Sequence, residues 1–160
     1  MVTDFRRLLD ALASAQVEFV LIGGLALAIR GSSRATQDLD ICYARDAGNL
    51  DRLATALRPL QPRLRGAPDD LPFLWDSQTL RSGLNFTLRT DAGDIDVLGE
   101  ISGVGDFRAA AAGATTLELY GQQVLVMSLD LLEHSKRAAG RAKDLLDLAE
   151  IAEIRRKLRG

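Results

Sequence analysis

The sequence predicts an α/β (α+β) fold in which helices flank a mixed β-sheet and a helical segment ends the chain. Short runs of continuous or alternating apolar residues predict strands at 18–22, from Asp38 onward, and in a hairpin at 84–98. Apolar residues at helical spacing predict helices between and after these strands. Because helical and strand segments are interleaved along the chain, we expect helices packed on a sheet.

The N-terminal half supplies most of the predicted scaffold. A helix at 4–15 is expected, with Thr3 as its N-cap. After the first strand, Gly23-Gly24 allows a tight turn into a short helix. Another helix, beginning at residue 46 or 47, ends before Pro59. The segment 59–70 contains three prolines and is predicted to be a loop. Trp75, which follows it, is interpreted as a core or lid residue rather than as a platform for base stacking.

Asp38 and Asp40 are the most informative residues of the chain. Alternation along a strand places both carboxylates on one face, whereas Leu39 points to the core. Neighbouring carboxylates repel, and desolvation increases that cost. A divalent ion such as Mg²⁺ relieves the repulsion, since it prefers oxygen ligands and commonly binds together with phosphates. Gly23 and Gly24 precede the pair and allow the backbone to approach an anion closely, so this segment predicts a metal-dependent phosphate site.

The predicted hairpin adds a third carboxylate to this site. Its two strands, 84–90 and 94–98, alternate apolar and polar residues and are joined by a turn that ends at Gly93. Asp96 lies in mid-strand, where aspartate is disfavoured, and we interpret it as a metal ligand. Asp94 lies nearer the turn and is a weaker candidate, which a solvated position also explains.

Composition and charge exclude several classes of protein. The 160 residues suffice for one domain with a core, and the net charge of −2 gives no overall basic field for nucleic acid. Cys42 is the only cysteine and His134 the only histidine, which excludes internal disulfides, zinc clusters and histidine-based triads. No apolar run is long enough to span a bilayer, and the N-terminus lacks a signal-peptide core. We therefore expect a cytoplasmic protein without a membrane partner.

Three motifs together resemble the polymerase β-like nucleotidyltransferase superfamily. They are Gly23-Gly24, Asp38-Leu39-Asp40 and Ile95-Asp96-Val97, in that order. The resemblance implies a nucleotidyltransferase fold with Asp38, Asp40 and Asp96 as catalytic residues and metal ligands. It also implies two Mg²⁺ ions, with Mn²⁺ as an alternative, and an NTP substrate. The implied reaction moves an NMP to a hydroxyl acceptor and releases pyrophosphate.

The C-terminal third resembles one branch of that superfamily. Lys136, Arg141, Lys143-Asp144 and Asp147 are similar to a signature of the small bacterial abortive-infection (AbiEii-like) toxin class. We predict a catalytic core at 1–127 and helices at 128–160 packed on it, within one structural domain. The predicted nucleotide-binding residues are Gly23, Gly24, Arg34, Lys136, Arg141 and Asp144. Asp144 has two open roles, orienting a cation or binding the acceptor, and the role of Asp147 also remains open.

The sequence is compatible with three functional classes. The first is a toxin-type nucleotidyltransferase that acts on RNA, with tRNA as the expected acceptor and a cognate antitoxin as partner. The second is a small-molecule enzyme of the antibiotic-modifying kind. The third is a non-catalytic, antitoxin-like member that binds a toxin. The complete carboxylate triad argues against the third class, and the C-terminal signature favours the first. The shortness of the chain counts against a large RNA interface.

Overall fold

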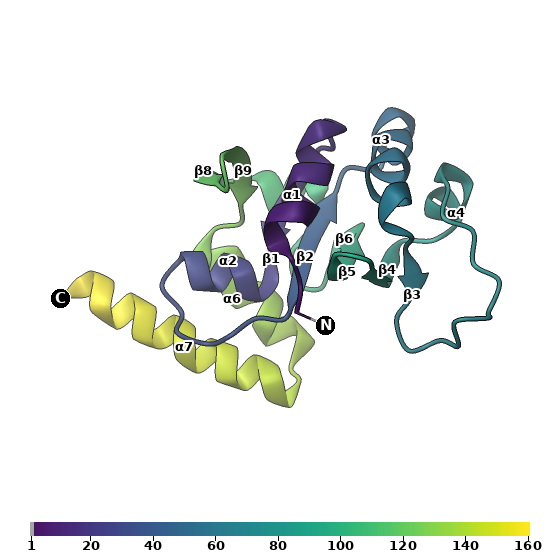
Figure 1. The fold of residues 1–160 in the computed structure, drawn as a ribbon. Coiled ribbons are helices and arrows are strands. Elements are labelled where there is room, and N and C mark those ends of the chain that lie inside the picture. Colours follow the sequence, from purple (N-terminus) through teal and green to yellow (C-terminus); the bar gives the residue numbers. More distant parts are fainter. Residues whose placement is uncertain (1) are drawn as a thin grey trace.

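The computed structural model describes residues 2–160 as a mixed sheet with helices on both faces (Figure 1). The helices are α1 (Phe5–Ser14), α2 (Gly23–Ile29), α3 (Ala47–Leu57), α4 (Ser77–Ser82), α5 (Phe107–Ala111), α6 (Leu129–Ala139) and α7 (Ala142–Arg159), with a 3-10 turn, η1 (Arg58–Leu60). The strands are β1 (Phe19–Ile22), β2 (Asp38–Tyr43), β3 (Arg63–Leu64), β4 (Asn85–Thr90), β5 (Gly93–Leu98), β6 (Glu100–Ile101), β7 (Gly105–Asp106), β8 (Thr115–Leu119) and β9 (Gln122–Val126).

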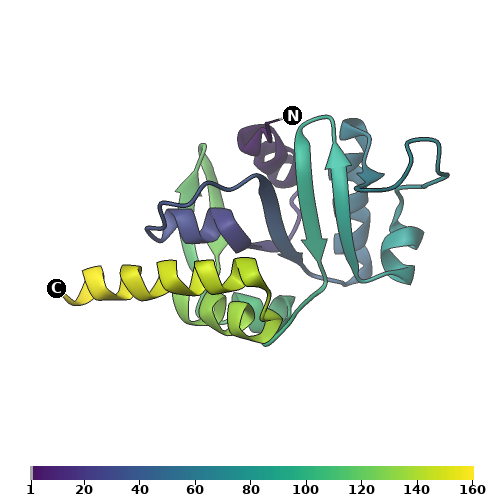
Figure 2. The same ribbon diagram turned by 90° about the horizontal axis from the view of Figure 1, so that it is seen from below.

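The main sheet has seven strands in the order β3-β4-β5-β2-β1-β9-β8. The pairs β2–β5 and β1–β9 are parallel and the other neighbours are antiparallel, which confirms the predicted mixed sheet. Strands β6 and β7 pair with each other outside it. Figure 2 shows α1 and α3 behind the sheet, whereas α7 lies in front, at one end. The face of β2, β5 and β4 beside α7 is therefore left uncovered by α1 and α3.

The hydrophobic core follows the predicted alternation of the strands. Leu39 and Ile41 of β2 and Ile95 and Val97 of β5 are fully buried. Leu8, Leu9 and Leu12 of α1 pack on the same cluster. Trp75 is also buried in this cluster, and its indole nitrogen donates to the carbonyl of Ala54 at 3.1 Å, so of the two predicted positions the structure gives the core one. The core cluster also includes Leu27 of α2, Leu132 of α6 and Ile151 of α7.

The predicted N-cap of the first helix is wrong by one residue. The side chain of Asp4, not that of Thr3, accepts from the backbone of Arg7 at 3.0 Å. The Thr3 hydroxyl donates to the carbonyl of Gln37 and accepts from the backbone of Asp94 at 3.1 Å. Thr3 does not cap the helix because its hydroxyl is engaged in these tertiary hydrogen bonds. They attach the N-terminal segment to the first residues of β2 and β5.

The prolines of segment 59–70 predicted a loop, but the segment is not a loop throughout. It contains β3, which pairs antiparallel with β4 so that Leu64 lies opposite Leu88. Pro62 directly precedes the strand and leaves its two residues free to pair. Two residues are too short for an alternation pattern, and β3 forms because β4 offers unpaired backbone groups along its outer edge.

A capping side chain and a glycine set the two ends of α6. The Ser128 hydroxyl accepts from the backbone of Leu131 at 3.2 Å, and Gly140 ends α6 with a positive φ of 63°. Glu150 of α7 accepts from the hydroxyls of Ser32 and Ser33, just after α2. These contacts fix α7 beside the turn that leads into β2. No helix in the described part of the chain has the length and apolar composition needed to cross a membrane.

Candidate active site

Strand register brings the predicted carboxylates together. In the parallel pair of β2 and β5, Asp40 lies opposite Asp96 and Asp38 lies opposite Asp94. All four side chains lie on the uncovered face, because the residues between them point into the core. Oxygens of Asp38, Asp40 and Asp96 lie within 4.8 Å of one another. The structure therefore assembles the three-carboxylate cluster expected from the sequence.

The cluster carries the repulsion predicted for it. Burial, followed by the charge of Asp96 and a hydrogen bond with it, holds the pKa of Asp40 well above its usual range. Burial likewise raises the pKa of Asp38, although Arg65 opposes the shift. Oδ1 of Asp96 is buried and has no hydrogen-bond partner among residues 2–160. A hard divalent cation would satisfy this oxygen and neutralise its neighbours, so these donors fit Mg²⁺ or Mn²⁺.

Gly23 and Gly24 place the start of α2 directly against β2. A Cβ on Gly23 would lie 2.0 Å from Oδ2 of Asp40, and Gly23 has a positive φ of 69°. A Cβ on Gly24 would lie 2.6 Å from the hydroxyl oxygen of Thr36. Both positions therefore require glycine, Gly23 for its backbone conformation as well as for space. The close approach that glycine allows is made here to the side chains of Asp40 and Thr36, and the approach to an anion stays a prediction.

Two cavities meet at the carboxylates. The larger, of about 480 Å³, extends over β4, β5 and α6, and the smaller, of about 380 Å³, extends toward the turn between α2 and β2. Asp38, Asp40, Lys136 and Lys143 line both cavities. Gly23 lines the larger cavity and Gly24 the smaller. A site of this shape can hold two ligands whose reacting atoms meet at the carboxylates.

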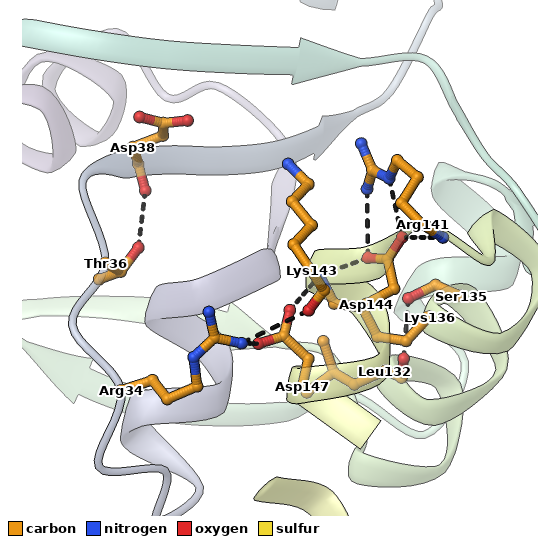
Figure 3. Close-up of polar contacts among 10 residues, drawn as sticks. All are labelled: Arg34, Thr36, Asp38, Leu132, Ser135, Lys136, Arg141, Lys143, Asp144 and Asp147. Carbon is orange, nitrogen blue, oxygen red and sulfur yellow. Dashed lines mark hydrogen bonds and ion pairs between the residues drawn. The ribbon is translucent and has the colours of Figure 1, made fainter. Parts of the chain in front are cut away.

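Two carboxylates of α7, Asp144 and Asp147, hold a cluster of three cations, Arg34, Lys136 and Arg141 (Figure 3). Lys136 Nζ lies 3.0 Å from Oδ2 of Asp147 and 3.6 Å from Oδ1 of Asp144. Arg34 reaches Asp147 from the other side, and Arg141 Nε contacts Asp144 at 2.7 Å. Asp144 and Asp147 lie one turn apart on α7, so together they tie three cations to one helix face.

The environment of Asp144 supports one of its two predicted roles. Its side chain is fully buried, and burial raises its pKa. Hydrogen bonds from the side chain and backbone of Arg141, with the charges of Arg141 and Lys136, outweigh burial and leave the pKa below its usual value. A buried carboxylate with these partners is suited to orienting Lys136 and Arg141 rather than to binding an acceptor.

Two further residues of the site were not among the predicted ones. Lys143 stands one position before Asp144, and Figure 3 shows its side chain extending from α7 toward β2. The basic-acidic pair of the C-terminal signature already contained Lys143, so a signal for it was present. Arg65 contacts Asp38, Asp94 and Asp96. No sequence pattern indicated Arg65, because it follows a two-residue strand within a proline-rich segment.

Comparisons with known proteins identify the fold. No family model matches the sequence, and neither does any curated protein. The structure is similar to the crystal structure of the lincosamide antibiotic adenylyltransferase LnuA, bound to lincomycin. That match has a TM-score of 0.60 and 15% identity, and it covers 96% of this chain and 99% of LnuA. The chain has a nucleotidyltransferase fold.

An antigenic nucleotidyltransferase-like protein from Paracoccidioides brasiliensis also matches, at 18% identity and a TM-score of 0.49. This match covers 96% of this chain and 77% of that one. The first comparison confirms the predicted fold class. Membership of the abortive-infection toxin class, which rested on the C-terminal signature, remains a prediction.

Proposed function

We propose that this protein is a divalent-metal-dependent nucleotidyltransferase. It moves an NMP from an NTP to a hydroxyl group of an acceptor and releases pyrophosphate. The observation that carries the proposal is the position of Asp38, Asp40 and Asp96, which lie on paired strands at the junction of two cavities. The nucleotidyltransferase fold supports it.

In this proposal, residues of the sheet bind the metal ion and residues of the C-terminal helices bind the phosphates. Asp38, Asp40 and Asp96 would hold Mg²⁺ or Mn²⁺, which would supply Lewis-acid chemistry to the phosphate and to the acceptor hydroxyl. Lys136 and Lys143 border both cavities and offset the charge of the phosphates. Glycine at positions 23 and 24 keeps the main chain next to the reacting groups without side-chain obstruction.

The reaction is an in-line displacement at phosphorus. The acceptor oxygen forms a bond to the α-phosphorus, and the bond from that phosphorus to the bridging oxygen of the β-phosphate breaks. Pyrophosphate leaves with the electron pair. Asp96 is the group proposed to receive the hydroxyl proton, because it is the one carboxylate of the three that lines only the larger cavity. Asp144 and Asp147 keep Lys136 and its neighbouring arginines in place during the reaction.

The linings of the two cavities support a small-molecule acceptor. The charged side chains found only in the larger cavity are the acids Asp96 and Glu100 and the ion pair of Asp144 with Arg141, which leaves this cavity an excess of acid. The same cavity offers amide and hydroxyl groups from Asn85, Thr87, Ser102 and Ser135. An acidic, hydroxyl-rich wall suits a neutral or cationic polyhydroxylated molecule and repels the phosphates of RNA. We therefore assign the acceptor to the larger cavity and the triphosphate to the smaller one.

The cavity linings favour a small-molecule acceptor, whereas the C-terminal signature favoured RNA. The structural neighbour LnuA is an antibiotic adenylyltransferase, and the match spans nearly the whole of both chains, which supports the small-molecule acceptor. An RNA acceptor and a cognate antitoxin rest on the sequence resemblance alone. The non-catalytic alternative is disfavoured by the intact triad.

Transfer of label from an NTP tests the proposal. The full chain is incubated with each α-labelled NTP and Mg²⁺ or Mn²⁺, together with either a panel of hydroxylated antibiotics or total RNA. We expect pyrophosphate release and label on a small molecule, both abolished by chelation and by Asp38→Asn. Label on RNA alone would establish the toxin-type activity in place of the small-molecule one. Absence of both NTP binding and transfer would identify a non-catalytic member.

A further inference from the structure

Arg65 lies in the same cross-strand row as two of the metal-binding carboxylates. Leu64 is opposite Leu88, and the next residue, Arg65, donates its backbone N–H to the carbonyl of Thr87 at 3.0 Å. Thr87 is in turn opposite Asp96. Side chains in one row share a face of the sheet, so the guanidinium faces the site with only a threonine between it and Asp96.

The guanidinium reaches three carboxylates across this threonine. Its terminal nitrogens lie 2.9 Å from Oδ1 of Asp96 and 3.6 Å from Oδ2 of Asp38, and its Nε lies 3.3 Å from Oδ2 of Asp94. Only 19% of the side chain is exposed. Arg65 is thus the one cation of residues 2–160 that forms an ion pair with Asp38 or Asp96.

These contacts are ionic rather than directional. The hydrogen bond that fixes the guanidinium runs from its terminal nitrogen to the carbonyl of Leu88, at 2.7 Å. Nε of Arg65 and Oδ1 of Asp96 are both buried without a hydrogen-bond partner among residues 2–160, despite their proximity to opposite charges. A group attracted by charge but not locked by hydrogen bonds to the carboxylates can be displaced from them by a stronger cation.

We propose that Arg65 is a built-in counter-cation that occupies the carboxylate cluster of the metal-free protein and competes with the divalent ion. The inference rests on the proposed function only in placing that ion at Asp38, Asp40 and Asp96. When the ion binds, the guanidinium gives up Asp38 and Asp96 and keeps Asp94, which lies outside the metal-binding set. This assigns a role to the fourth carboxylate: Asp94 retains Arg65 beside the site.

Mn²⁺ affinity measured on the full chain without nucleotide tests the proposal. Isothermal titration or the Mn²⁺ resonance signal is recorded for the wild type, Arg65→Gln and Arg63→Gln. Arg63 is the matched control, since it lies two residues away on β3 and pairs with Asp91 at 3.6 Å rather than with the cluster. We expect Arg65→Gln to bind Mn²⁺ about tenfold more tightly, because a positive charge next to the ion has been removed. Arg63→Gln should bind as the wild type does.

Two further variants, Arg65→Lys and Asp94→Asn, test the same proposal if Arg65→Gln folds poorly. Arg65→Lys retains the charge on the same backbone and should stay closer to the wild type in affinity than Arg65→Gln. Asp94→Asn should weaken Mn²⁺ binding more in the wild-type background than in the Arg65→Gln background, since it removes the group that retains the displaced guanidinium.

The outcomes separate this proposal from the proposed function. Equal or weaker Mn²⁺ binding by Arg65→Gln, alongside measurable binding by the wild type, would overturn the role of Arg65 and leave the metal site intact. Absence of Mn²⁺ binding in the wild type and in every variant would overturn both. Equal tightening in Arg63→Gln and Arg65→Gln would also contradict the proposal, because it would reflect overall charge rather than competition at the cluster.

Discussion

Two groups of aspartates face each other across the site, and their surroundings are opposite in kind. Asp38, Asp40 and Asp96 on the sheet lie close to one another, with Arg65 as their nearby cation. Asp144 and Asp147 on α7 each contact two cations. The sheet cluster has excess negative charge, whereas the helix cluster is neutralised within the protein.

The difference in neighbouring charges shifts the pKa values of Asp40 and Asp144 in opposite directions. Burial and the neighbouring Asp96 raise the pKa of Asp40, whereas the hydrogen bonds and charge of Arg141 outweigh burial and lower that of Asp144. Burial alone acts in the same direction on both residues, so the neighbours decide the sign. We infer that the sheet group is suited to an external cation and that the helix group holds its own cations ready for an anion.

Removal of one sheet carboxylate should have the largest effect on activity. Asp40→Asn keeps the shape of the side chain but removes a charged metal ligand, and we expect transfer to fall by more than about a hundredfold, beyond the loss typical for residues that only support a ligand. Without metal, the variant should melt a few degrees higher than the wild type, because a repelled, desolvated carboxyl group is gone. Label transfer and thermal melting measure the two effects.

The matched control for Asp40→Asn is Asp51→Asn, which changes an exposed carboxylate of α3. It should leave both activity and melting temperature near the wild-type values. Mn²⁺ should raise the melting temperature of the wild type and of Asp51→Asn more than that of Asp40→Asn. Full transfer activity in Asp40→Asn would contradict the carboxylate mechanism.

Removal of a cation from the helix cluster should have an intermediate effect, on nucleotide binding. Lys136 is 13% exposed, lines both cavities and is oriented by Asp147. We expect Lys136→Ala to weaken binding of a non-hydrolysable NTP by about tenfold or more, the usual loss for a charged hydrogen bond. Lys157→Ala, at the exposed end of α7, serves as the control. Equal affinities in the two variants would reduce the helix cluster to scaffold.

The smallest expected effect concerns stability and pH. Because the pKa of Asp144 is lowered on folding, its contribution to stability is complete above its usual value of 3.8 and is lost as the pH falls below that value. Asp144→Asn should therefore lower the free energy of unfolding by about 1–3 kcal/mol at pH 7 and by less at pH 3. Urea unfolding at both pH values measures this difference.

Asp130→Asn is the control for the pH experiment, since Asp130 also pairs with an arginine, Arg155, but is largely exposed. It should destabilise the protein less than Asp144→Asn at pH 7. If the loss from Asp144→Asn were the same at both pH values, the helix cluster would not be held together by charge.

The members of the carboxylate cluster could be predicted from sequence because the face that each occupies on its own strand depends on local pattern, whereas their meeting depends on the pairing of β2 with β5. Alternation places Asp38 and Asp40 on one face of a strand, and the hairpin around Gly93 places Asp96 on another. The glycine pair and the ends of α6 were predictable for the same reason. Each depends on the conformations open to a few consecutive residues. A resemblance carried by three short motifs was then enough to indicate the fold.

The partners of the charged residues were decided by tertiary structure. Arg65 meets Asp96 because an edge strand too short to leave a pattern pairs with β4, and Thr3 leaves its helix because Gln37 and Asp94 lie within reach. Asp144 and Asp147 orient cations because α7 packs against α6 and the turn after α2. Sequence alone determined which residues carry charge and which face of its own element each occupies. Long-range packing determined which charges meet, because ion pairing depends on distances between elements that no local pattern specifies.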